Sequence, residues 1–571
     1  MNTEIIGIIA TYGITFLLAI PLGRYIAKVF AGEKVWTDFL KPFERFIFRL
    51  SGIDSTKEMN WKESMKTMLT ISTIWLIYAL FTLIFQDKLP LNPDHNSGQT
   101  PDLAFNTAIS FLVNCNIQDY SGETGVTYFT QLFVLMFLHF MSAASAIAAM
   151  MVIYKGLKEK SVTTLGNFWD YFVKSITRFL LPGSILIAII LAFNGTPTSY
   201  GGKDTVIIMQ GDTTQVSRGP AAAMIAIKHF GTNGGGWFGA NSAHPFECPN
   251  YLTYMVEMVA QLVIPIALIF ALGFYLKKKK FAYIIFGVMT IGMFMLLIPT
   301  LQAEMHGNPE IAKMGISHAN TAMEGKEVRF GIPATAYWST QTTVTSTGSA
   351  CGAHDSYMPM TTGMELMAMM VNCFYGGCGV GFMNYYIMII IAVFISGLMV
   401  GRTPEFMGHK VEAREMKIAS IAALLHPFLI LSFTALSCFV LVNFPDIKWA
   451  FQPKNWLGNP GYHGFSEMLY QYTSAAANNG SAMGGLTANN VFWNVTTGIV
   501  LLFSRFIPII GPVAIAGLMA NKKFIPESAG TLKTDTGTFG IMTLAVIIII
   551  AALAFFPALA LGPFAEYFTM K

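Results

Sequence analysis

The segment "YQYTSAAANNG" (470–480) and three segments like it decide the fold of this chain. Small and hydroxyl residues lead into a polar pair and a glycine, a pattern typical of a short helix that ends in a turn. Three other eleven-residue windows align with it: "NTAISFLVNCN" (106–116), "MIAIKHFGTNG" (224–234) and "TTVTSTGSACG" (342–352). The chain therefore contains four copies of one structural unit.

Long apolar stretches flank these windows. A bilayer core needs about 20 apolar residues per helix. Ten such stretches occur, at 4–27, 67–86, 126–154, 176–194, 251–276, 281–301, 383–401, 418–443, 491–519 and 539–566. Of the 571 residues, 53% are hydrophobic and only 12% are charged, which excludes a chain of several soluble domains. We therefore predict an all-α membrane protein with ten transmembrane helices.

Basic residues are distributed unevenly between the connections. The loops after the first, third, fifth, seventh and ninth predicted spans hold 25 of the 36 Lys and Arg residues, and the other side holds 10. Because Lys and Arg gather on the cytoplasmic side, both termini are predicted to lie outside. Arg505 is left inside the ninth span.

This topology places all four windows outside, in repeat units that share one orientation. Parallel repeats in a membrane are most simply arranged around an axis along its normal, so the four helix–pore loop–helix repeats surround a central pore. Irregular backbone at membrane depth persists only inside protein or along a wet cavity, and rings of carbonyls that replace the water shell of an ion are one such use. The loops therefore predict an ion filter, in which Gly234, Gly352, Gly480 and Asn116 can adopt left-handed conformations.

The spans and windows together set the predicted units. Residues 1–60 form the first transmembrane helix and a cytoplasmic loop, and 521–571 form the last transmembrane helix. The four pore repeats occupy 61–160, 161–280, 281–415 and 416–520.

Four segments carry a resemblance to a known family: "NTAISFLVNCNIQDYSGET" (106–124), "GTNGGGWFGANSAHPFECPN" (231–250), "STGSACGAHDS" (346–356) and "SAAANNGSAMGGLTANNVFWN" (474–494). They resemble the potassium-transporting ATPase A subunit family (KdpA), in a superfamily of potassium transporters built from four helix–pore loop–helix units. The resemblance covers the whole chain. It implies a channel-like subunit of the bacterial inner membrane that selects K⁺ and passes it to a separate P-type ATPase subunit. The implied complex also contains a single-span subunit with a periplasmic domain and a very small membrane peptide.

Carried onto this chain, the resemblance implies a K⁺ filter formed mostly by backbone carbonyls. Its residues would be three consecutive positions in each loop: Asn114, Cys115 and Asn116; Thr232, Asn233 and Gly234; Ala350, Cys351 and Gly352; Asn478, Asn479 and Gly480. Cys115 and Ala350 carry no hydroxyl, so any hydroxyl ligand at those positions in relatives is missing here.

The segment "VNCFYGGCGVGFMNYY" (371–386) interrupts an apolar stretch with Gly376, Gly377, Gly379 and Gly381. Four glycines within six residues cost a helix about 3–4 kcal/mol, which predicts a break. One interpretation is a kink that allows close helix packing. The other, which the superfamily resemblance favours, is a loop that crosses below the third filter segment and gates the pore.

Arg505 lies near the middle of the ninth span, where an uncompensated charge costs about 2.5–3.5 kcal/mol. Two interpretations stay open. Arg505 is either an electrostatic barrier or coupling point beneath the filter, or the partner of a buried acid such as Glu257 or Glu365.

The chain carries no ATPase motif of its own. The text nearest to the phosphorylation signature DKTGT is "TDTGT" (534–538), which lacks the lysine, and no GxxxxGK[ST] phosphate loop is present. ATP energy, if the chain uses any, must therefore come from a partner. The alternative function is a K⁺ channel or an ion-coupled carrier of the same superfamily that works with a regulatory partner.

Three minor features have simpler interpretations. His244, Glu247 and Cys248 are metal-ligand types at close spacing, but a metal site needs further ligands, so ordinary loop residues are favoured. The segment "WTDFLKPFERFIFRL" (36–50) is typical of an amphipathic surface helix, and "KKKK" (277–280) is suited to anionic membrane lipid. Nucleic acid is not an expected partner.

Overall fold

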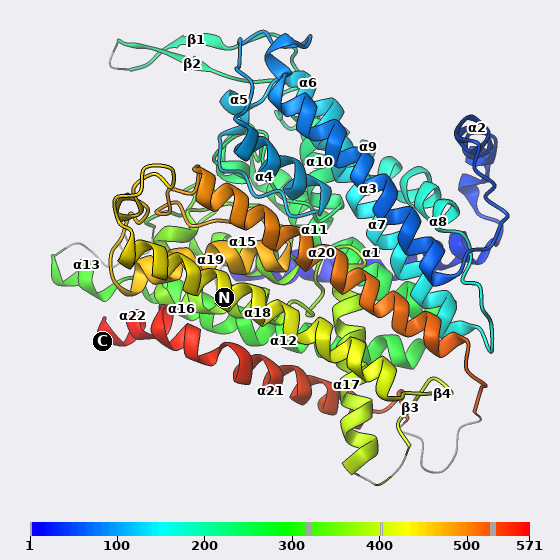
Figure 1. Cartoon of the computed structure of the whole chain (residues 1–571). Coiled ribbons are helices and arrows are strands. Elements are labelled where there is room, and N and C mark those ends of the chain that lie inside the picture. Colours follow the sequence, from blue (N-terminus) through cyan, green and yellow to red (C-terminus); the bar gives the residue numbers. More distant parts are fainter. Residues whose placement is uncertain are drawn as a thin grey trace.

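Ten long helices form the body of the molecule (Figure 1). The computed structural model describes residues 3–209, 211–315, 323–399, 401, 403–525 and 533–570. Within them, ten spans are long and apolar enough to cross a membrane. Eight are the helices α1 (Thr3–Ala31), α3 (Trp61–Ile84), α11 (Tyr251–Tyr275), α12 (Lys279–His306), α17 (Val380–Met399), α18 (Ala413–Asn443), α20 (Val491–Ala520) and α21 (Gly537–Leu561), and the other two are the longer stretches 128–158 and 168–193, which end in α7 (Met136–Lys158) and α9 (Leu181–Phe193). The ten predicted spans are confirmed.

Two of these spans contain a π-helical turn. α6 (Tyr128–Thr130) and η3 (Gln131–Leu135) lead directly into α7, and α8 (Phe168–Ser175) and η4 (Ile176–Leu180) lead into α9. Asparagine caps begin three of the long helices, because the side chains of Asn60, Asn250 and Asn490 accept hydrogen bonds from the free N–H groups of the first turn.

Four shorter helices lie between pairs of spans, and each is too short to cross a membrane. They are α4 (Pro101–Leu112), α10 (Ala222–Phe230), α15 (Ile332–Val344) and α19 (Tyr462–Ala477). Nearly all of their residues are buried. Each follows the first helix of a pair and precedes the second, so the predicted fourfold helix–pore loop–helix plan is confirmed.

The second helix of each repeat lies closer to the centre than the first. In the most apolar 18-residue stretch of α11, 83% of the residues are buried, whereas in that of the span that ends in α9 only 33% are buried. α7 and α20 are likewise more buried than α3 and α18. The inner helices therefore surround the pore helices, while the outer ones expose apolar side chains, as a lipid-facing surface requires.

In the third repeat the second helix is broken. α16 (Pro359–Val371) ends at Asn372, which takes a left-handed conformation at φ 44°, and α17 begins at Val380. The glycine-rich interruption predicted in this stretch is confirmed.

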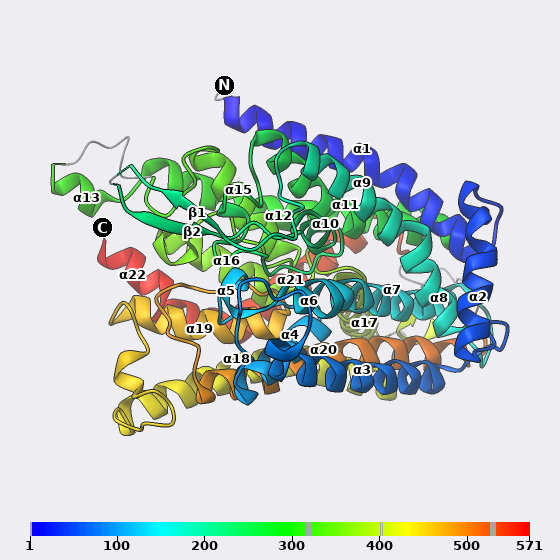
Figure 2. The same ribbon diagram turned by 90° about the horizontal axis from the view of Figure 1, so that it is seen from above.

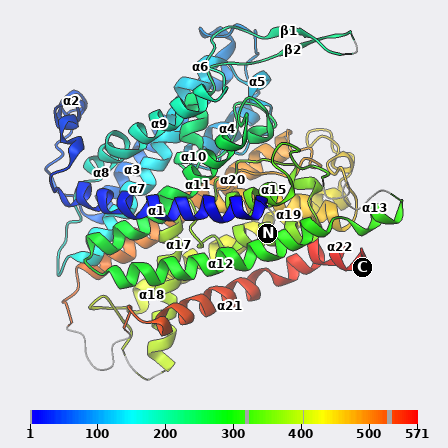
Figure 3. The ribbon, with the colours of Figure 1, turned by 180° about the vertical axis from the view of Figure 1, so that it is seen from behind.

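The two ends of the bundle differ. The antiparallel hairpin of β1 (Asp204–Ile207) and β2 (Thr213–Val216), the helix α13 (Pro309–Lys313) and both termini lie toward one end (Figures 2 and 3). At the other end, α2 (Lys41–Ser51) lies across the direction of the spans (Figure 2). Trp36, Phe43 and Phe46 are exposed there, as predicted for an amphipathic surface helix.

Short elements complete the described chain. They are η1 (Trp36–Leu40), η2 (Gln86–Lys88), α5 (Gly122–Gly125), η5 (Asn241–Ala243), η6 (His354–Ser356), β3 (Glu405–Phe406), β4 (His409–Lys410), η7 (Pro453–Asn455) and α22 (Pro563–Thr569). The two small hairpins are the only strand pairs among the described residues, and the all-α class stands.

Candidate functional site: a ring of four loops

The four pore helices end in loops with the same backbone shape. Shortly after the helix end, one residue adopts a left-handed conformation, and the second residue after it does so again. The first position is held by Asn114, Thr232, Ser346 and Asn478, with φ of 62°, 50°, 50° and 52°. The second is held by Asn116, Gly234, Gly348 and Gly480, with φ of 62°, 83°, 78° and 107°. This repeated pattern shows which loop positions are equivalent.

The third loop differs from its predicted register by four residues. The positions equivalent to those of the other loops are Ser346, Thr347 and Gly348, and not the predicted Ala350, Cys351 and Gly352. The reason is that α15 already ends at Val344, so the turn follows at once.

Backbone contacts close the loops into a ring. A Cβ added to Gly234 would overlap the carbonyl oxygen of Thr347, one added to Gly348 would overlap that of Asn479, and one added to Gly480 would overlap that of Cys115. The circle closes where Asn116 Nδ2 donates to the Gly234 carbonyl at 3.1 Å. The second loop therefore touches the third, the third touches the fourth, the fourth touches the first, and the first touches the second.

Side-chain amides hold the first two loops in this arrangement. Asn114 Nδ2 donates to the Thr232 carbonyl at 2.7 Å, and Asn114 Oδ1 accepts from Ser142 Oγ at 2.9 Å and from Asn233 Nδ2. In the fourth loop, Asn479 Nδ2 donates to the carbonyl of Thr342 on α15 at 2.8 Å. Buried amides bonded in this way fix the direction of the loop carbonyls.

The first loop continues into an acidic residue. Asp119 Oδ2 accepts from Asn106 Nδ2 at 2.8 Å, which ties the loop back to α4. Burial raises the pKa of the Asp119 carboxyl to about 6, and the hydrogen bond from Asn106 limits the shift.

An open vestibule lies against the ring. It has a volume of about 420 Å³ and is lined by Asn116, Gly348 and Gly480 of the ring and by Ala350 and Gly352. Ala350 and Gly352, predicted as filter residues, therefore line the vestibule instead, and Cys351 is buried next to them.

The helix break contacts two of the loops and the end of the pore helix that precedes a third. The Cys378 N–H donates to Thr232 Oγ1 of the second loop at 2.8 Å. Ser346 Oγ of the third loop donates to Asn372 Oδ1 at 2.8 Å, and Asn372 Nδ2 donates to the carbonyl of Ala477 before the fourth loop at 3.3 Å. The break is therefore a loop joined to the ring and not a simple kink.

The four predicted glycines have different surroundings, and Gly381 is already the second residue of α17. Gly376 and Gly379 have positive φ, of 60° and 78°. A Cβ on Gly381 would overlap the carbonyl oxygen of Tyr375, whereas one on Gly377 would meet only Thr232 Oγ1 at 3.7 Å and Asn114 Nδ2 at 4.0 Å. Gly377 is therefore the glycine whose added side chain would point at the ring.

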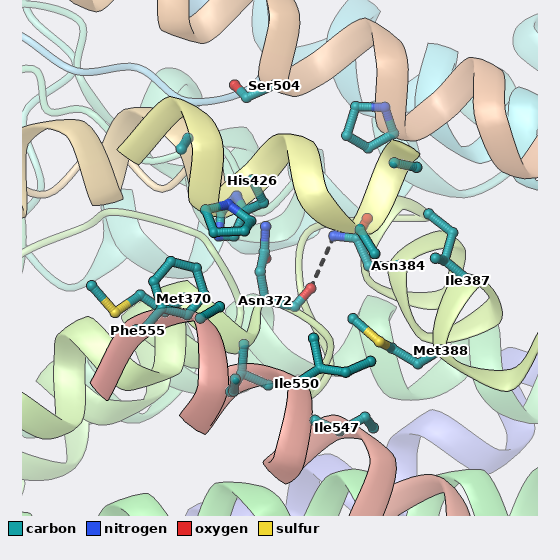
Figure 4. A pocket seen from close by; sticks show the side chains of 18 of the residues that line it. Met370, Asn372, Asn384, Ile387, Met388, His426, Ser504, Ile547, Ile550 and Phe555 are labelled. Carbon is teal, nitrogen blue, oxygen red and sulfur yellow. Dashed lines mark hydrogen bonds between the residues drawn. The ribbon is translucent and has the colours of Figure 1, made fainter. Parts of the chain in front are cut away.

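A small cavity of about 60 Å³ lies beside the break, where α17, α18, α20 and α21 meet (Figure 4). Asn384 Nδ2 donates to the carbonyl of Asn372 at 2.9 Å, the contact drawn as a dashed line. Asn478 of the fourth loop also lines this cavity, among mostly apolar neighbours such as Phe555. The break and the fourth loop thus share one cavity.

Arg505 is buried on α20 and has no carboxylate partner in the described parts of the chain. Its Nη2 lies 3.4 Å from the carbonyl oxygen of Ser142, and Cys115 and Cys378 lie close enough for electrostatic interaction. Both acids predicted as its partner are paired elsewhere: Glu257 with His229 at 2.9 Å and Glu365 with His354 at 3.0 Å. The ion-pair interpretation is therefore wrong for these two acids, and Arg505 remains a cation near Cys115 of the ring and Cys378 of the break.

A buried ion pair behind the second loop escaped the sequence analysis. Lys228 Nζ contacts Glu247 Oε2 at 2.6 Å, and both side chains are fully buried. The signal is a lysine inside the apolar helix "MIAIKHF" (224–230), which needs a partner. Glu247 is thus a structural residue. The ring of His244 stacks on that of Phe238, with the ring centroids 4.0 Å apart, as expected for ordinary loop residues.

Comparisons with known proteins agree with this architecture. The family model described as "Potassium-transporting ATPase A subunit" (KdpA) matches residues 9–568. Proteins named "Potassium-transporting ATPase potassium-binding subunit" are 62% identical in Flavobacterium psychrophilum and 58% identical in Bacteroides thetaiotaomicron, with all of each chain covered. Among solved structures, the potassium transporter TrkH from Vibrio parahaemolyticus matches with a TM-score of 0.51 at 12% identity, over 89% of this chain and 98% of that one. This last likeness concerns the fold alone.

Proposed function

The chain belongs to the potassium-transporting ATPase A subunit family, and from this premise we propose that it is the K⁺-binding, channel-like subunit of an ATP-driven uptake complex. K⁺ is the transported ion. It binds from outside in the ring of four loops and is passed to a P-type ATPase subunit.

The closed ring carries this proposal. Eight left-handed positions, two in each loop, turn consecutive carbonyls within a site where no lipid can reach them. The proposed filter residues are Asn114, Cys115, Asn116, Thr232, Asn233, Gly234, Ser346, Thr347, Gly348, Asn478, Asn479 and Gly480. Thr347, which takes the place first given to Cys351, adds a hydroxyl to the third loop.

The break and Arg505 control passage in this proposal. The loop of Gly376, Gly377 and Gly379, with Gly381 at the start of α17, acts as a gate, because hydrogen bonds join the break to two of the four loops and to the end of the pore helix before a third. Arg505 acts as an electrostatic barrier or coupling point, because its charge lies beside Cys115 and Cys378 and no carboxylate in the described residues neutralises it.

The proposed setting is the inner membrane of a bacterium, with both termini outside. The uneven distribution of 25 of the 36 basic residues over alternate loops supports this orientation. The proposed partners are the P-type ATPase subunit, a single-span subunit with a periplasmic domain, a very small membrane peptide, and membrane lipid.

The test is K⁺-stimulated ATP hydrolysis by the full chain and the subunits that copurify with it in mild detergent. Gly348→Ala places a methyl group against the Asn479 carbonyl, so we expect at least a ten-fold loss of K⁺ affinity or a changed preference between K⁺ and Rb⁺. Gly52→Ala is the matched control, because Gly52 has φ 65° and nothing within 4 Å of an added Cβ.

The outcomes separate the candidates. Equal K⁺ affinity and ion preference in Gly348→Ala and Gly52→Ala would contradict the filter. A chain that purifies alone, or with a soluble nucleotide-binding regulator, and shows no ATPase activity would favour the K⁺ channel or ion-coupled carrier.

A further inference from the structure

A cluster of ionisable side chains lies apart from the ring, at the start of the fourth pore helix. His463 and Glu467 are four residues apart on α19 and therefore share one face of the helix. Asp355 reaches them from η6, after the third loop, and Glu566 from the C-terminal helix α22. Ligand atoms of Asp355, His463 and Glu467 all lie within 4.8 Å of one another.

We propose that Asp355, His463 and Glu467 form a binding site for a divalent transition-metal ion such as Zn²⁺. One imidazole and two carboxylates are a ligand set that such ions accept, with the remaining position open to water. The site joins the outer segments of the third and fourth repeats and does not depend on the proposed K⁺ filter.

The distances suit this ion. His463 Nε2 lies 3.3 Å from Asp355 Oδ1. Two ligands of a tetrahedral zinc ion, each about 2.0–2.1 Å from the metal, are about 3.3 Å apart. The third ligand atom, of Glu467, lies within 4.8 Å of both.

The second nitrogen of His463 is already oriented for metal binding. Nδ1 lies 2.9 Å from Glu566 Oε1. Histidines that bind metals almost always donate their other ring N–H to a carboxylate or carbonyl, which fixes the ring and leaves Nε2 for the metal. Glu566 is the positioning residue of this site.

Glu467 supplies an independent argument. Its side chain is completely buried. Oε1 accepts from the backbone N–H of Asn459 at 3.2 Å and from Asn459 Nδ2 at 3.1 Å, but Oε2 has no hydrogen-bond partner among the described residues. A buried carboxylate oxygen without a partner is costly, and a metal ion would satisfy it.

The charge of the cluster favours a divalent cation. Three carboxylates, of Asp355, Glu467 and Glu566, surround one imidazole. Lys326, which lines the same cavity of about 310 Å³, is already paired with Glu304 at 2.6 Å. Even a protonated His463 therefore leaves the cluster with excess negative charge, and the cavity gives an ion and its water a way in.

A proton is the competing occupant. Burial alone would lower the pKa of His463, but its hydrogen bonds to Asp355 and Glu566 raise it to about 10. Without metal, His463 is therefore an imidazolium that holds α22 against α19. A metal ion must displace the Nε2 proton.

The test measures Zn²⁺ binding to the full chain, with its copurifying subunits, after treatment with a chelator and in the presence of excess K⁺ and Mg²⁺. We compare the wild type with Glu467→Gln, Asp355→Asn and Glu566→Gln by metal analysis and titration calorimetry. The matched control is His306→Gln, an exposed histidine at the end of α12.

We expect the wild type to bind a Zn²⁺ ion, and Glu467→Gln and Asp355→Asn to bind it with at least a ten-fold weaker affinity. Glu566→Gln should weaken binding 10–100-fold, and His306→Gln should bind as the wild type does. No Zn²⁺ binding by the wild type, or binding that all three substitutions leave unchanged, would overturn the site. The substitutions are close to isosteric, and the wild-type measurement decides even if one variant fails to fold.

Discussion

The second and fourth repeats have loops of the same backbone shape, but their buried carboxylates are held differently. In the second repeat, Glu247 contacts Lys228 at 2.6 Å and also accepts the N–H groups of Trp237 and Phe238. In the fourth, the described residues bond Glu467 through one oxygen only, to Asn459. One carboxylate is fully satisfied within the protein, and the other is not.

This difference distinguishes a carboxylate with a structural role from a carboxylate that can still bind a ligand. A buried ion pair with complete hydrogen bonding leaves no room for a ligand and fastens the outer loop to the pore helix. A buried carboxylate with a free oxygen beside a histidine can still bind a cation. The same substitution, Glu to Gln, should therefore destabilise the fold strongly at Glu247 and only slightly at Glu467.

The largest effect is expected for Glu247→Gln. The amide can still accept the backbone N–H groups, but the Lys228 ammonium is left buried without a counter-charge. We expect a loss of about 3–5 kcal/mol in the free energy of unfolding, measured as a lower midpoint of denaturation of the detergent-solubilised complex.

The control for this variant is Asp446→Asn, which removes an exposed ion pair with Lys454 on the same side of the molecule. Exposed pairs contribute little, so its midpoint should stay near that of the wild type. Equal midpoints for Glu247→Gln and Asp446→Asn would show that the buried pair does not hold the second repeat together.

The spans, the fourfold plan and the helix break could be predicted from the sequence, because each depends on local composition. Apolar length sets a span, and four glycines end a helix wherever they occur. The register of the third loop was missed because "TSTG" (345–348) and "SACG" (349–352) both offer small residues followed by glycine. The residue before the last position does not decide the register, because Thr347 is polar like Asn233 and Asn479 whereas Cys351 matches Cys115 of the first loop.

Side-chain pairing could not be predicted in the same way. Glu257 and Glu365 are suitable partners for Arg505 by residue type, but they are paired with His229 and His354 instead. Which acid meets which base depends on how helices far apart in the chain pack together. The cluster of Asp355, His463 and Glu467 was missed for the same reason, since it joins two repeats.

A medium effect is expected for Thr232→Val, which tests another difference between the two repeats. Thr232 Oγ1 accepts the Cys378 N–H of the break, whereas the equivalent Asn478 donates to Ser504 on α20 at 3.1 Å. Valine keeps the shape but leaves the Cys378 N–H unpaired, at a cost of about 1–3 kcal/mol. We expect faster hydrogen–deuterium exchange in residues 372–379.

Thr70→Val is the control, because the exposed Thr70 hydroxyl donates to the Lys66 carbonyl within its own helix, α3. Exchange in residues 372–379 should not change in this variant. If Thr232→Val also left that exchange unchanged, the second loop would not fasten the break.

The smallest effect is expected for Glu467→Gln in chelator-treated protein. The glutamine carbonyl can accept both bonds from Asn459, and no partner of Oε2 is lost, so the denaturation midpoint should differ little from that of the wild type. Added Zn²⁺ should raise the midpoint of the wild type, since a ligand that binds only the folded state stabilises it, and should not raise that of the variant. A large loss of stability without metal would mean that Glu467, like Glu247, is a structural group, and the contrast between the two repeats would disappear.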